Sequence, residues 1–200
     1  MSELQPKLNA FKQIVIDNCK NEAFTFRDWF ISDHMMIVEK IAMQLCDIYT
    51  AADRDIVFAL VWFHDFGKPI DEKNEREITK TKGVEELRAV GMDEDFVQKV
   101  LAHWTRMEMK EIIDISKEAI EVQIVSSSDG ASHFVGKFYP GYFEDLKTDG
   151  MKKVIDDLRS KMTKDWERKI VLPEVKASFK NRYEHAREII GEYPEKFITV

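Results

Sequence analysis

His64 and Asp65 stand side by side at the end of an apolar run, and both side chains can bind a metal ion. The residues before them, 56–63, are all apolar, so the helix that they predict should be buried. A buried imidazole or carboxylate is costly unless it is paired, hydrogen-bonded or bound to a metal. This pair therefore needs partners from elsewhere in the chain.

The apolar stripes of two other predicted helices lead to such partners. His34 begins the stripe of a helix predicted over 32–47, and Asp129 ends the stripe of a helix predicted over 117–130. His133 lies one turn further along. Two imidazoles and two carboxylates that meet in a helical core form a mixed nitrogen and oxygen site. Such a site suits one divalent ion, for which Mn, Fe, Co, Ni, Zn and Mg are all candidates.

Ordinary structural roles are alternatives for each of these residues taken singly. A lone histidine on an apolar stripe, such as His103 or His133, is more often a hydrogen-bonded core residue than a ligand. Asp129 alone could cap a helix. These alternatives explain the whole set less well, because every member would need its own buried partner.

Helical periodicity dominates the chain, and alternating segments typical of strands are scarce, which predicts an all-α fold. Asp53 and Asp93 suit helix N-caps, Gly91 suits a helix C-terminus, and Pro173 suits a first turn. The predicted helices cover residues 6–19, 32–47, 53–66, 77–90, 94–109, 117–130, 142–163 and 173–191.

We expect one domain in three parts. An N-terminal helix within 1–24 packs on a core over 25–140, and 141–200 forms a C-terminal helical extension of the same domain. The more charged extension is expected to hold peripheral amphipathic helices, which could serve a homodimer.

Composition excludes several classes of function. The net charge of −7 gives no broad surface for nucleic acid or an anionic membrane, and no apolar run is long enough to span a bilayer. Only two cysteines are present, without a C-x-x-C spacing, so a disulfide framework is not indicated. We expect a soluble, cytoplasmic protein.

The order His34, His64-Asp65, Asp129 resembles the HD superfamily of metal-dependent phosphohydrolases. The resemblance covers roughly residues 25 to 140. It includes the context Ala-Leu-Val-Trp-Phe-His-Asp-Phe-Gly-Lys around the doublet and Val-Ser-Ser-Ser-Asp-Gly-Ala-Ser-His around the last aspartate. It implies an HD-domain-like helical bundle in which these four residues bind the metal.

Departures from the family's subpatterns narrow this expectation. Members with two metals usually place a further histidine four residues before a glycine, where this chain has Thr79, so we favour a single metal. His103 matches the family's other extra histidine and could assist a second, weakly bound metal, hold phosphate or orient a ligand. The 5'-deoxynucleotidases and alarmone hydrolases carry a carboxylate where this chain has Lys68 and Pro69, so neither subfamily is matched.

The resemblance implies hydrolysis of a phosphate ester of a nucleotide or a small phosphorylated metabolite by a metal-activated water. Asp65, Lys68 and His133 are then the candidate catalytic residues. Lys68 would contact phosphate, and His133 would protonate the leaving oxygen or bind phosphate. Two alternatives stay open: a catalytically silent module that binds nucleotide or metabolite and keeps the metal, and a purely structural helical protein.

Overall fold

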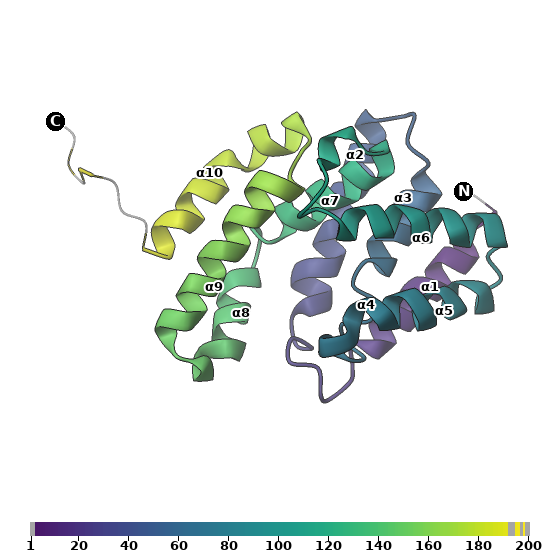
Figure 1. Cartoon of the computed structure of the whole chain (residues 1–200), viewed down its shortest axis with the longest axis horizontal. Helices are drawn as coiled ribbons and strands as arrows, with labels where there is room; N and C mark the ends of the chain where they lie inside the picture. The colour runs from purple at the N-terminus through teal and green to yellow at the C-terminus, as the bar shows by residue number, and fades with distance from the viewer. Residues whose placement is uncertain (1–2, 192–194, 197, 199–200) are drawn as a thin grey trace.

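The structure is a computed structural model that describes residues 3–191, 195–196 and 198. Within these residues all regular structure is helical, which confirms the predicted all-α fold. Figure 1 shows α7 between two groups of helices, with α1 to α6 on one side and α8 to α10 on the other. The helices are α1 (Gln5–Asn18), α2 (Met36–Ile48), α3 (Arg54–Phe63), α4 (Glu75–Ile78), α5 (Val84–Ala89), α6 (Glu94–Glu108), α7 (Ile120–Ser132), α8 (Phe138–Leu146), α9 (Met151–Lys164) and α10 (Pro173–Ile189).

Short helical turns extend or connect several of these helices. Three are π-helical, namely η1 (Ile31–Met35), η3 (Thr79–Gly83) and η6 (Asp165–Lys169). The others are 3₁₀ turns, namely η2 (Glu72–Asn74), η4 (Ile115–Lys117) and η5 (Lys147–Asp149). Because single π turns within helices are frequent at functional sites, η1 and η6 mark segments that are relevant to chemistry.

The predicted helix ends are confirmed where side-chain chemistry determines them. The Asp53 carboxylate accepts a hydrogen bond from the amide of Ile56, and Asp93 accepts one from the amide of Phe96. Pro173 is the first residue of α10.

Three predicted helices differ from the structure. The helix expected over 142–163 is two helices, because Gly150 has φ +94° and separates α8 from α9. The helix expected over 77–90 comprises α4, η3 and α5. The helix expected over 117–130 begins at Ile120, after η4.

The core centres on α7, in which every residue from Ile124 to Ser132 is buried. On one side α7 packs against α2, α3 and α6, and on the other it packs against η6 and α10. Since α7 is covered from both sides, its polar residue Asp129 faces groups from distant parts of the sequence.

The N-terminal helix α1 packs against α3. The division into parts at residues 24 and 140 stays a prediction. Among the residues described here, no helix has both the length and the apolar character needed to cross a bilayer.

Candidate metal centre

The four predicted metal ligands converge on one point. His34 Nε2 lies 3.4 Å from Asp65 Oδ2 and 3.9 Å from Asp129 Oδ1. His64 Nε2 lies 3.7 Å and 3.9 Å from the same two oxygens. These separations exceed hydrogen-bond lengths, yet they suit atoms that share one ion at bonds of about 2.1 Å.

Hydrogen bonds at the opposite ring nitrogens fix the tautomers of both imidazoles. His34 Nδ1 lies 2.9 Å from Ser132 Oγ, whose own hydrogen is donated to the carbonyl of Asp129. His64 Nδ1 lies 2.6 Å from the carbonyl oxygen of Val61, which can only accept. Each Nδ1 must therefore carry the proton, and each Nε2 presents a lone pair to the site.

The residues fit a metal on direct structural grounds. His64 Nε2 is buried and has no hydrogen-bond partner among the described residues, although buried polar atoms are usually paired. His34 is 1% exposed, and burial lowers its pKa against the opposing effect of Asp65 and Asp129, so the ring is a neutral ligand. Two neutral nitrogens and two carboxylates are a donor set suited to a divalent transition ion.

Local sequence explains how the ligands reach this point. His34 lies in η1 directly before α2, and His64 follows the last residue of α3, where Trp104 Nε1 donates to its carbonyl oxygen at 3.1 Å. Gly67 lets the chain turn away after Asp65, because a Cβ there would lie 2.0 Å from the carbonyl oxygen of Glu75.

Thr79 replaces the histidine of two-metal members and has a structural role. Its hydroxyl donates to the carbonyl oxygen of Glu75 at 2.8 Å and accepts from the amide of Gly67 at 2.9 Å. Thr79 therefore fixes the loop that follows Asp65, and the single-metal expectation stays a prediction.

Charged residues of the C-terminal helices lie against Asp129. Their sequence pattern did not predict this position. Lys169 Nζ lies 2.8 Å from Asp129 Oδ2 and 3.0 Å from Asp165 Oδ1. Asp165 is fully buried and Lys169 is 7% exposed. Because Lys169 binds Oδ2 of Asp129, the other oxygen of that carboxylate is left to face the histidines.

Gly130 allows η6 to come this close to α7. A Cβ at Gly130 would lie 2.9 Å from Ile170 Cγ1, 3.0 Å from Lys169 Cβ and 3.1 Å from the carbonyl oxygen of Asp165. The glycine next to Asp129 therefore places η6 against the metal centre.

His133 joins the same network. Its Nδ1 lies 2.6 Å from Asp165 Oδ2, and its Nε2 lies 3.4 Å from Asp129 Oδ1. The Asp165 carboxylate accepts a hydrogen bond from Nδ1, so the proton stays on Nδ1 and Nε2 presents its lone pair to the centre. Nitrogens of His34 and His133 and an oxygen of Asp129 are close enough to act as ligands of one ion.

Burial and neighbouring charges set the ionisation of these groups. Burial opposes ionisation of Asp129, but Lys169 and three imidazoles outweigh it and hold its pKa well below the usual range. Asp65 behaves in the same way, with Lys68 and His64 as its main partners. Burial lowers the pKa of His133 to about 3 despite the nearby Asp165, so this ring is neutral near pH 7.

A cavity of about 420 Å³ opens beside the ligands, and both cationic and carboxylate side chains line it. Most of these cations already have partners, because Arg76 and Lys110 pair with Glu108 and Lys164 pairs with Glu111. The cationic side chains that line it are those of Lys68, Arg76, Lys110, Lys161, Lys164 and Lys169.

Lys68 and Lys161 form only long ion pairs at this cavity. Lys68 Nζ lies 3.4 Å from Asp65 Oδ2, and Lys161 Nζ lies 3.9 Å from Asp165 Oδ2, a looser ion pair than those of Lys169. The cavity therefore combines a metal-ligand cluster with ammonium groups, which suits a small anionic molecule.

The structure does not bring His103 to this centre. The charged groups that act on it are Glu121, Lys99, Asp53 and Glu118, and it does not line the cavity. The expected phosphate-binding or ligand-orienting role of His103 therefore has no support in this structure.

Comparison with family models matches residues 31–131, half of the chain, to the HD domain. The chain therefore belongs to the HD domain family. No curated protein and no solved structure gave a match to this chain.

Proposed function

We propose that this protein is a metal-dependent phosphohydrolase that hydrolyses a phosphate ester of a nucleotide or a small phosphorylated metabolite. One observation carries the proposal: two Nε2 lone pairs and two carboxylates meet at one buried point, and His64 Nε2 has no partner. His34, His64, Asp65 and Asp129 would hold the ion. A divalent ion bound there would lower the pKa of a coordinated water and neutralise charge on the phosphate.

The lysines of the cavity would bind the phosphate. Lys68 and Lys161 reach it from opposite groups of helices, and an ammonium near the reacting phosphorus stabilises the negative charge that builds there. The Asp65 carboxylate raises the pKa of Lys68 against the effect of burial, so its charge persists over the working pH range.

His133 would accept a proton. Its low pKa leaves Nε2 without a proton near pH 7, and Asp165 at Nδ1 would stabilise the imidazolium that forms. The sequence suggested instead that His133 protonates the leaving oxygen. That role needs a protonated ring at rest, which burial disfavours.

A neighbouring pocket of about 300 Å³ supports a substrate with a ring-bearing alcohol. It shares Lys68, Glu75, Tyr142 and Lys161 with the cavity beside the metal ligands, and its other walls include aromatic rings. A phosphate at the lysines would leave the esterified alcohol within reach of this pocket, where aromatic walls favour a nucleoside or a similar ring system.

The experiment compares the wild type with Asp65→Asn. Metal content is measured after purification, and phosphate release from nucleoside monophosphates and a generic phosphate ester is measured with added Mn, Co or Ni. We expect Asp65→Asn to lose the metal and to lower the rate on the order of a thousandfold. Asp47→Asn is the matched control, since Asp47 is an exposed carboxylate on α2.

Metal retained by Asp65→Asn would contradict the proposed ligand set. A wild type that binds metal and gains thermal stability from nucleotides, yet forms no product, would favour the silent binding module.

A further inference from the structure

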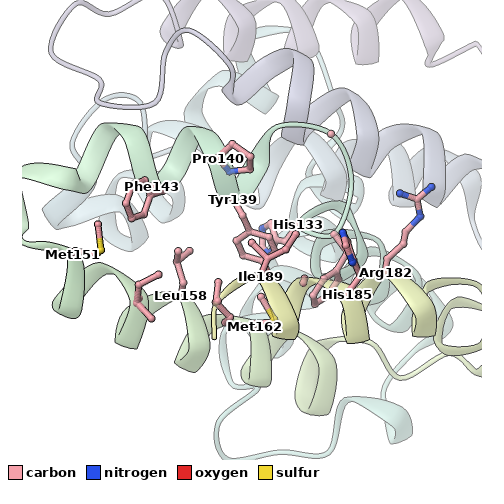
Figure 2. A pocket seen from close by; sticks show the side chains of 15 residues that line it. His133, Tyr139, Pro140, Phe143, Met151, Leu158, Met162, Arg182, His185 and Ile189 are labelled. Atoms are coloured by element: carbon pink, nitrogen blue, oxygen red, sulfur yellow. The ribbon is translucent and has the colours of Figure 1, made fainter. Parts of the chain in front are cut away.

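A second cavity, of about 520 Å³, lies between α8, α9 and α10, away from the metal ligands. We call it the apolar cavity. Figure 2 shows Phe143, Leu158, Met162 and Ile189 along its length. Its volume is in the range of sites that hold small molecules, and its lining is mainly apolar, as in most such sites.

Exposed apolar side chains at the cavity set it apart from ordinary surface. Met151 is 69% exposed and Ile189 is 71% exposed, although both line the cavity. Leu158 and Met162 on the same wall are almost fully buried. Apolar side chains that continue from a buried wall to an exposed mouth are typical of a ligand groove.

Charge at one end of the cavity indicates the chemistry of the ligand. Arg182 and His185 lie at the end opposite Met151 (Figure 2). Among the described residues that line the cavity there is no carboxylate. Within the described part of the chain, Arg182 makes no ion pair, so its guanidinium is available to an anion.

A single permanent cation suits a monoanion better than a doubly charged phosphate, and the planar guanidinium matches a carboxylate. Tyr139 adds a further polar contact. Its hydroxyl is buried without a hydrogen-bond partner, and burial raises its pKa, so it remains a donor. The cavity thus has one anion-binding end and a long apolar remainder.

We propose that the apolar cavity binds a free single-chain carboxylate of the fatty-acid type, with its carboxylate at Arg182 and its chain along α9. This site is separate from the cavity beside the metal ligands, and His133 lines both cavities. The ligand would therefore lie behind the imidazole that faces the metal centre.

Isothermal titration calorimetry with dodecanoate on the full chain tests the proposal. We expect one molecule to bind per chain, and dodecanol to bind more weakly because it has no charge. Arg182→Gln should weaken dodecanoate binding about threefold and leave dodecanol unchanged. Lys180→Gln is the matched control, because Lys180 is exposed on the same helix and does not line the cavity.

Two further variants test the position of the chain. Leu158→Trp fills the cavity and should weaken binding more than about tenfold. Ile189→Glu places a carboxylate at an exposed position of the mouth, so it should fold even where Leu158→Trp does not, and it should also weaken dodecanoate binding.

Several results would overturn the proposal. These are no binding of dodecanoate, equal binding of dodecanol, or wild-type binding by Ile189→Glu. Tighter binding of dodecyl phosphate or of anionic vesicles than of dodecanoate would reject a free carboxylate as the ligand. A dimer that Ile189→Glu converts to a monomer, without amphiphile binding by the wild type, would assign the cavity to a second copy of the chain.

Discussion

The two sides of α7 supply different chemistry to the candidate centre. The side formed by α1 to α6 supplies His34, His64 and Asp65, whose ligand atoms face the centre. The side formed by α8 to α10 and η6 supplies Asp165 and Lys169, which contact His133 and Asp129 at the end of α7. The first side supplies three of the four candidate metal ligands, and the second side contacts Asp129 and His133 and affects their charge state.

The boundary between the two sides lies close to the end of the family match, at residue 131. Asp165 and Lys169 lie beyond it, yet they are among the most buried charged residues of the chain. The C-terminal segment is therefore part of the candidate centre and has more than a covering role.

The largest expected effect on the C-terminal side comes from Lys169→Met. It leaves Asp129 and Asp165 buried without their shared cation, so the free energy of unfolding should fall by about 3–5 kcal/mol. Metal affinity should fall about 10–100-fold, because Asp129 loses the contact that orients it. Chemical denaturation and a metal titration measure the two effects.

Lys164→Met is the control for that change, since Lys164 forms only a partly exposed ion pair with Glu111. Wild-type stability and metal affinity in Lys169→Met would show that the C-terminal side does not support the centre.

Asp165→Asn should separate catalysis from metal binding. The amide oxygen can still accept a hydrogen bond from Nδ1 of His133, but the amide carries no charge to stabilise an imidazolium. We expect kcat to fall about 10–100-fold while the metal content stays at the wild-type level. Loss of metal in parallel with loss of rate would instead make Asp165 a support for metal binding alone.

Lys68→Gln should have a smaller effect, mainly on substrate binding. Removal of one ammonium from the cavity should raise KM about tenfold, with metal content unchanged. Lys80→Gln, an exposed lysine in η3, is the control. An unchanged KM would show that Lys68 does not bind the substrate.

Stability is also expected to depend on pH. In the metal-free protein burial lowers the pKa of His34 and His133 below the ordinary histidine value of about 6.5, so the unfolded state binds protons that the folded state does not. Stability should therefore be fully present above about pH 6.5 and fall toward lower pH, by about 1.4 kcal/mol per pH unit for each histidine. His133→Asn should reduce this slope, as measured by denaturation at a series of pH values between 4 and 6.5, and an unchanged slope would argue against a buried neutral His133.

The sequence predicts the α1 to α6 side well because its signals are local. His34, His64 and Asp129 each continue an apolar stripe at helical spacing, and caps such as Asp53 and Asp93 mark where helices begin. Burial at the end of such a stripe follows from helix geometry alone.

The α8 to α10 side is harder to predict because its important contacts are distant in sequence. Lys161, Asp165 and Lys169 recur at intervals of four residues, which is a helical signal, but a charged stripe usually faces solvent. Only the close approach of η6 to Gly130 shows that this stripe is buried. Gly150 likewise does not reveal from sequence whether a helix continues through it or ends there.

Anomalous diffraction from crystals grown with manganese tests the central claim most directly. We predict one peak per chain, surrounded by His34 Nε2, His64 Nε2 and carboxylate oxygens of Asp65 and Asp129. A peak only elsewhere, such as at His103, would contradict the assignment of the centre, and a second peak beside Thr79 would contradict the single-metal site.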